Sequence, residues 1–183
     1  MVICRSIKFE CIWNRGGLML ILGVDPGTAI TGYGLLEQNG NQLTARRFGV
    51  LKTSSDSSLS ERLKEIYNNI IDLVIEYKPE VMAVEELFFN KNSKTALAVG
   101  QARGVIMLAS AMQGVKVAEY TPLQVKMAVV GYGRAEKRQV QEMVRVLLRL
   151  DSVPKPDDAA DALAIAICHA HSWRCDRLTK GGG

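Results

Sequence analysis

Acidic side chains stand at the ends of several apolar segments of this sequence. One acid ends the first segment, a pair ends a later one, and three more open the last: Asp25; Glu85 and Glu86; Asp157, Asp158 and Asp161. Carboxylates at the ends of two strands can meet at one edge of a sheet. A helix presents residues three apart, such as Asp158 and Asp161, on one face. The spacing therefore allows a cleft lined by carboxylates.

Such a cleft has a defined chemistry. Carboxylates gathered in one place repel one another, and their pKa values rise unless cations neutralise them. Their oxygen atoms suit Mg²⁺ or Mn²⁺. Two ions about 3.5–4 Å apart suit phosphodiester hydrolysis, because one lowers the pKa of the attacking water and the other stabilises the leaving oxygen. The acids are therefore expected to serve mainly as metal ligands.

Each acid by itself also has a structural explanation. Asp25 precedes Pro-Gly and suits a turn, while Asp157 and Asp158 suit the start of a helix. Strand alternation puts Glu85 and Glu86 on opposite faces of a sheet but does not say which face carries a site. Only the joint pattern, on one arrangement of elements, favours a functional site.

The elements that must position these acids follow in an informative order. Strands are predicted at roughly 20–25, 31–36, 43–53, 81–85 and 115–120, with Asn39-Gly40 as a hairpin signal. Two helices open with a capping box, Ser58 with Glu61 and Thr121 with Gln124. The predicted helices begin at Ser58, after the loop 90–94, and at Thr121, Ala135 and Asp158; the last two end near Leu150 and Trp173.

This order predicts an α/β protein with a ribonuclease H-like fold. Its five-stranded mixed sheet has three antiparallel strands followed by parallel strands, and helices flank it. A TIM barrel or a doubly wound nucleotide fold would begin with alternating strands and helices instead. We expect one domain at 19–175, a tail at 176–183, and an N-terminal extension at 1–18 outside the fold, with Met19 as the natural start.

Composition limits the function less than the motifs do. The net charge of +4 and the pI near 8.9 permit a nucleic-acid partner without requiring one. No run of about 20 uncharged apolar residues predicts a membrane span. The cysteines form no CxxC pair, and the charged first 18 residues do not resemble a secretory segment, so a reducing, cytoplasmic setting is expected. Zinc binding by Cys168, His169, His171 and Cys175 is not expected, because residues two apart do not share a helix face.

Several segments resemble the RuvC family of Holliday junction resolvases, over roughly 19–172. They are MLILGVDPGT from Met19, TGYG from Thr31, AVEELF from Ala83, GQARGV from Gly100, QVK from Gln124, VVG from Val129, AEK from Ala135 and DAADALAIA from Asp158. Each motif alone is modestly specific, whereas their order and spacing together are highly specific.

The resemblance implies a set of catalytic residues. The metal-binding acids of the family correspond to Asp25, Glu85, Asp158 and Asp161, which selects Glu85 over Glu86 and Asp158 over Asp157. Its lysines near the site correspond to Lys126 and Lys137, which would meet phosphate oxygens. The implied cofactor is Mg²⁺, with two ions per site, and Mn²⁺ as a substitute.

The resemblance also implies DNA contacts and partners. Phe88 would stack on a base near the crossover, and Lys91 and Lys94 lie in a polar, basic loop suited to phosphate. Arg103 suits either DNA or an acid, and this choice stays open. A four-way junction has two-fold symmetry, so a homodimer is implied, with the apolar second helix as a possible interface. A branch-migration helicase complex is a further implied partner.

The expected function is therefore paired, metal-dependent cutting of four-way DNA junctions in recombination and repair. Three alternatives are weighed against it. Asp25-Pro-Gly-Thr also resembles the phosphate-binding turn of sugar kinases and actin-like ATPases, but those need a second domain. A non-catalytic DNA-binding module would be expected to lack an acid. A nuclease for RNA–DNA hybrids would show itself by substrate preference.

Overall fold

The computed structural model describes residues 18–86 and 93–180. Within these ranges the strands are β1 Leu18–Asp25, β2 Ile30–Asn39, β3 Gln42–Lys52, β4 Val81–Glu85 and β5 Lys116–Tyr120. The helices are α1 Leu59–Tyr77, α2 Ser93–Met112, α3 Pro122–Val130, α4 Lys137–Leu147 and α5 Asp157–Lys180.

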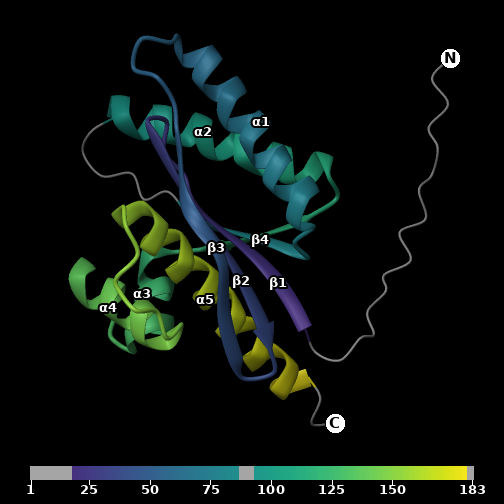
Figure 1. Ribbon diagram of the computed structural model, residues 1–183, viewed down its shortest axis with the longest axis vertical. Helices are drawn as coiled ribbons and strands as arrows, with labels where there is room; N and C mark the ends of the chain where they lie inside the picture. Colours follow the sequence, from purple (N-terminus) through teal and green to yellow (C-terminus); the bar gives the residue numbers. More distant parts are fainter. Residues whose placement is uncertain (1–17, 87–92, 181–183) are drawn as a thin grey trace, which may run out of the picture.

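The strands form one mixed sheet in the order β3-β2-β1-β4-β5, so β1 lies at its centre. β1, β2 and β3 are antiparallel, whereas β4 pairs parallel to β1 and β5 parallel to β4 (Figure 1). The predicted fold class is confirmed. The β2–β3 hairpin turns at Gly40-Asn41, because Asn39 still pairs with Gln42, and Gly40 has a φ of 58°.

Helices cover both faces of the sheet. α1 and α2 pack against each other on one face, where Leu22, Val24, Met82 and Val84 are buried against them. α5 crosses the other face along β1 and β2, and α3 and α4 pack against α5 (Figure 1). α5 is thus enclosed between the sheet and two helices, which explains why its first half is apolar nearly all round.

The helix boundaries differ slightly from those predicted. α5 continues to Lys180 instead of ending near Trp173, because no glycine or proline interrupts it before Gly181. α4 is shorter than predicted, since Glu136 is its N-cap and Arg149, just beyond its end, has a φ of 53°. Both expected capping boxes are present, Ser58 with Glu61 and Thr121 with Gln124.

Among the described residues, we find no helix with the length and apolar character needed to cross a membrane.

Candidate active site at the carboxyl ends of β1 and β4

Strand alternation places Asp25 and Glu85 on the same face of the sheet. Val24 and Val84 pair with each other and are buried on the α1 and α2 side. The residues that follow them, Asp25 and Glu85, therefore face the α5 side. Glu86 takes the opposite orientation by the same alternation. The structure thus brings Glu85, not its neighbour, to the end of β1.

Two glycines let α5 approach these strands closely. A Cβ atom added at Gly23 would lie 2.1 Å from the carbonyl oxygen of Ala162, and one at Gly32 would lie 2.0 Å from that of Asp158. Only residues without a side chain permit such contact between a strand and a helix backbone. The contact brings the first turn of α5, with Asp158 and Asp161, to Asp25. Neither glycine was among the predicted site residues, although a glycine inside a strand is a signal of close approach.

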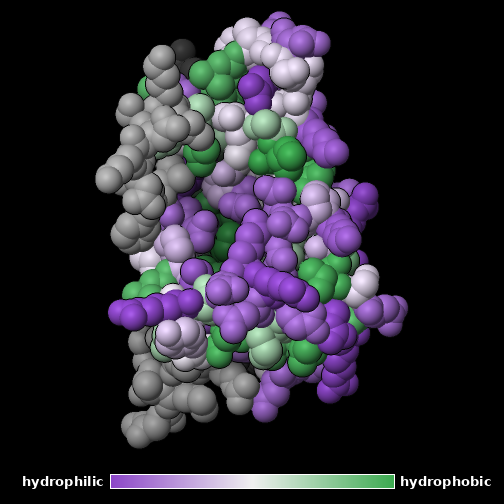
Figure 2. Space-filling model, turned by 90° about the vertical axis from the view of Figure 1, so that its left-hand side faces the viewer, coloured by the Kyte–Doolittle hydropathy of each residue, from purple (hydrophilic) through white to green (hydrophobic). Residues whose placement is uncertain are grey.

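A pocket of about 200 Å³ opens where these elements meet. Its charged lining consists of Asp25, Glu85, Asp161, Lys126 and Lys137, and its apolar part includes Val125, Val140 and Ile165. On the side of the molecule that bears α3 and α4, mostly hydrophilic residues border a hollow (Figure 2). Three acids and two lysines predicted from the sequence therefore lie in one pocket.

The carboxylates in this pocket disfavour one another's ionisation. Burial, and then the charges of Asp161, Glu85 and Asp158, raise the pKa of Asp25 from 3.8 to about 7, and Lys137 opposes the shift. Burial and the charge of Asp161 raise the pKa of Glu85, against the lowering effect of Lys126 and Lys137. The crowding expected from the sequence is present.

Lys137 forms ion pairs with two acids at the start of α5. Its Nζ lies 2.9 Å from Oδ2 of Asp161 and 3.6 Å from Oδ2 of Asp157. Burial lowers the pKa of Lys137, but the hydrogen bond and charge of Asp161 outweigh this effect. The pKa is therefore raised, and the ammonium form is favoured. Asp157, interpreted as a helix-end charge, also helps to hold Lys137.

The donor set fits a hard divalent cation by its chemistry. Carboxylate oxygens are the ligands that Mg²⁺ and Mn²⁺ prefer, and a cation relieves the repulsion that raises the pKa of Asp25. In the described part of the chain, no three acidic, histidine or cysteine side chains converge closely enough to hold an ion as they stand. In this arrangement Asp161 instead contacts the ammonium of Lys137.

The remaining predicted site residues either do not line the pocket or have side chains outside the described part of the structure. Asp158 does not belong to the pocket lining, but its charge raises the pKa of both Asp25 and Asp161. Phe88 and Lys91 lie outside the described residues. Lys94 lies in the first turn of α2, and its side chain is likewise outside the description.

The two histidines of α5 have polar partners on different elements. Nδ1 of His169 lies 2.7 Å from the hydroxyl of Tyr120, and burial lowers the pKa of His169 to about 4. Nδ1 of His171 lies 3.0 Å from the carbonyl oxygen of Ala128. Cys168 is buried, and burial raises its pKa to about 11. His169 thus faces the end of β5, whereas His171 faces α3.

The raised pKa of Asp25 predicts how the stability of the metal-free protein depends on pH. Its pKa rises from 3.8 to about 7 on folding, so the folded state favours the protonated form. The stability from this group is fully present below pH about 4 and is lost as the pH rises through about 7. Urea unfolding in EDTA should show this loss, and Asp25→Asn should flatten it. If the free energy of unfolding changes with pH by the same slope in wild type and Asp25→Asn, the effect belongs to other groups.

Comparison with known proteins shows which family has a similar sequence. The family model for "Crossover junction endodeoxyribonuclease RuvC" matches residues 21–169. A protein of that name from Alkaliphilus metalliredigens is 56% identical over 162 residues, covering 88% of this chain and 99% of its own. The one from Heliobacterium modesticaldum is 61% identical over 154 residues, covering 84% and 95%.

A solved structure agrees with these sequences. The structure of Thermus thermophilus RuvC in complex with Holliday junction substrate has a TM-score of 0.82 and 37% identity, covering 86% of this chain and 96% of that one. The matched residues 21–169 include Asp25, Glu85, Asp161 and both pocket lysines. The chain therefore belongs to the RuvC family of crossover junction endodeoxyribonucleases.

Proposed function

We propose that this protein resolves four-way (Holliday) DNA junctions by paired phosphodiester hydrolysis in recombination and repair. The observation that carries the proposal is the pocket where carboxylates from β1, β4 and α5 lie beside Lys126 and Lys137. The T. thermophilus relative, of known structure with Holliday junction substrate, supports the same substrate for this chain.

Nucleases of this family depend on metal ions, and we propose Mg²⁺, with Mn²⁺ as a substitute. Asp25, Glu85, Asp158 and Asp161 would hold two ions. Bound there, such ions would lower the pKa of an attacking water and stabilise charge on the leaving oxygen. The acids also set a condition on the pH, because Asp25, with its pKa of about 7, must give up its proton to become a ligand.

The two lysines position the substrate in this scheme. Lys126 comes from α3 and Lys137 from the start of α4, so they enter the pocket from elements that pack against α5. Their ammonium groups would bind the oxygens of the phosphate to be cut, as point charges without a fixed orientation. When phosphate is bound, Lys137 would exchange its contact with Asp161 for a phosphate oxygen. Phe88, Lys91 and Lys94 stay predicted DNA contacts.

Cleavage of a labelled four-way junction tests the function directly. An end-labelled mobile junction is incubated with Mg²⁺ or with EDTA, beside a linear duplex and an RNA–DNA hybrid. We expect paired, symmetric nicks on the junction only, and none with EDTA. Tight junction binding without nicks would indicate a binding module, and cutting of the hybrid instead would indicate a different nuclease.

We propose that α2 forms the interface of a homodimer, which places two active sites on a two-fold symmetric junction. Leu97, Leu108 and Met112 of α2 are exposed by 64%, 54% and 66%. A Cβ atom at Gly104, on the same helix, would meet no atom within 4 Å. Glycine costs about 1 kcal/mol in a helix interior, and close approach by a second copy would account for it.

Leu108→Glu should therefore separate the subunits. We expect a monomer by light scattering, an unchanged far-ultraviolet spectrum, and loss of paired nicks, because a carboxylate would be buried against the partner copy. Ile75→Glu is the matched control, since Ile75 is exposed by 56% on α1. A Leu108→Glu protein with the same mass as the control would rule out this face. The helicase partner, the cytoplasmic location and the N-terminal extension at 1–18 stay predictions.

A further inference from the structure

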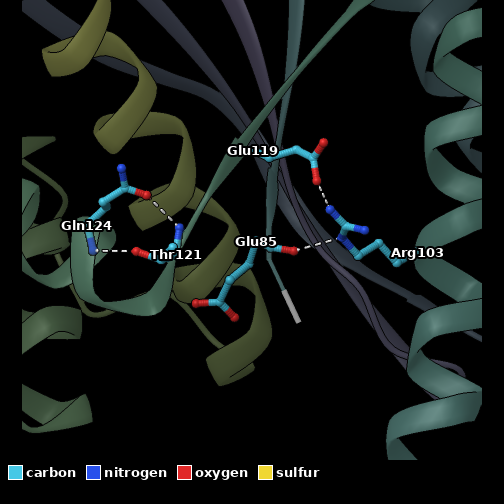
Figure 3. A network of polar contacts seen from close by, with 5 residues as sticks. All are labelled: Glu85, Arg103, Glu119, Thr121 and Gln124. Carbon is cyan, nitrogen blue, oxygen red and sulfur yellow. Dashed lines mark hydrogen bonds and ion pairs between the residues drawn. The ribbon is translucent and has the colours of Figure 1, made fainter. Parts of the chain in front are cut away.

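Arg103 of α2 reaches the end of β4 that carries Glu85 (Figure 3). Its Nε donates a hydrogen bond to the main-chain carbonyl oxygen of Glu85 at 3.1 Å. Its Nη2 forms an ion pair with Glu119 of β5. The Arg103 side chain is only 19% exposed. The sequence left its partner open between DNA and an acid, and within the chain the partner is an acid.

The contact lies where the pairing of β4 becomes one-sided. β1 pairs with β4 only as far as Val84, opposite Val24, whereas β5 still pairs with Glu85 through Tyr120. The next backbone N–H, that of Glu86, also donates to the carbonyl oxygen of Tyr120, at 2.8 Å. Arg103 thus supplies a hydrogen-bond donor at the end of β4, where β1 no longer pairs with it.

The guanidinium and the Glu85 carboxylate lie on different sides of the strand. In Figure 3 the Glu85 side chain points away from Arg103, toward α3 and α5. Fixing the carbonyl of Glu85 restrains the backbone from which this side chain projects. Restraint matters here because an error of about 1 Å in a reacting group can cost about 100-fold in rate.

Glu119 orients the guanidinium and links it to a second element of the pocket. Thr121, two residues later, caps α3 through reciprocal hydrogen bonds with Gln124 of 2.8 and 3.1 Å (Figure 3). α3 carries Lys126. Glu119 is 40% exposed, so the ion pair contributes little stability by itself. Its main consequence is geometric, because the planar fork of arginine can address two acceptors at once, which a lysine ammonium cannot do with the same fixed geometry.

We propose that Arg103 is a positioning residue for Glu85. It joins α2 to the ends of β4 and β5, and so keeps the Glu85 carboxylate directed into the pocket without touching DNA. This role rests on the proposed function of the pocket as the nuclease centre. It also gives the helix proposed as the dimer face a direct connection to the active site.

The test compares Arg103→Gln, Arg103→Lys and Glu119→Gln with Arg46→Gln as control. Arg46 pairs with Glu37 on β2 and does not line the pocket. Three quantities are measured for each protein: the single-turnover rate of junction cleavage in Mg²⁺, junction affinity in EDTA, and Mn²⁺ affinity by electron paramagnetic resonance without DNA.

We expect Arg103→Gln to slow cleavage by about 10–100-fold and to weaken Mn²⁺ binding by a similar factor, as loss of a partner of a metal ligand does. Junction affinity should stay within about two-fold of wild type, because in this proposal Arg103 does not contact DNA. Arg103→Lys should restore only part of the rate, and Glu119→Gln should show a smaller loss of the same kind. Arg46→Gln should match wild type.

Three outcomes would overturn the proposal. They are unchanged cleavage and Mn²⁺ affinity in folded Arg103→Gln, a loss of junction affinity equal to the loss of cleavage, and full rescue by lysine. If Arg103→Gln does not fold, Glu119→Gln decides by the same criteria. Wild-type protein that cuts no junction would contradict the proposed function, whereas the Mn²⁺ comparison would still test the positioning of Glu85.

Discussion

Asp25→Asn is expected to abolish junction cleavage while leaving junction binding intact. The change removes a carboxylate that lines the pocket and on which the charges of Asp161, Glu85 and Asp158 all act. Even partners of metal ligands typically cost 10–100-fold when they are lost, so we expect a fall of more than about 100-fold. The basic groups that attract DNA are unchanged. Cleavage in Mg²⁺ and gel-shift affinity in EDTA, measured on one preparation, give the two quantities.

The same substitution should not destabilise the protein. Burial and like charges disfavour the ionised form of Asp25, so a neutral amide of similar size relieves repulsion at neutral pH. Asp72→Asn, on the exposed side of α1, is the control and should cut like wild type. Parallel loss of cleavage, binding and thermal stability in Asp25→Asn would show that Asp25 is structural.

Gly32→Ala is expected to impair cleavage although it removes no carboxylate. The added Cβ would lie 2.0 Å from the carbonyl oxygen of Asp158 and 2.6 Å from its carbonyl carbon, and these backbone atoms cannot rotate away. The first turn of α5 must therefore move, and Asp158 and Asp161 move with it. A displacement of about 1 Å can cost about 100-fold in rate, and overpacking costs about 1–3 kcal/mol in stability.

Gly49→Ala provides the matched control for this effect. Gly49 lies on β3, and the nearest atoms to its added Cβ would be the hydroxyl and ring of the Tyr33 side chain, at 3.0 Å or more. A small shift of that side chain accommodates it. Urea unfolding gives the stability of each variant, and cleavage is then compared where both are folded. A Gly32→Ala protein that cuts at the rate of the Gly49→Ala protein would show that α5 tolerates displacement.

Local patterns in the sequence predicted most of the elements and the candidate acids. The capping boxes at Ser58 and Thr121 are predictable from the sequence because each involves residues only three apart. The apolar period of α1 likewise identified its buried face, which includes Ile66 and Ile70. Such signals survive in a single sequence because both partners lie within one turn of helix or one strand.

The arrangement of the site was decided by contacts between distant segments. Asp25 and Asp158 meet because β1 lies at the centre of the sheet and the glycines of β1 and β2 admit α5. The order of strands determined that Glu85 shares a face with Asp25. The partners of Lys137 and Arg103 also come from other elements.

The sequence by itself therefore determined the identity of the chemical groups, the order of the elements and the family. Only the tertiary structure decided that Asp25, Glu85 and Asp161 share one pocket and which lysines lie beside them. The physical reason is that hydrophobic periodicity and capping act over a few residues. Carboxylate crowding and helix-to-strand contact instead depend on how segments far apart in the chain pack together.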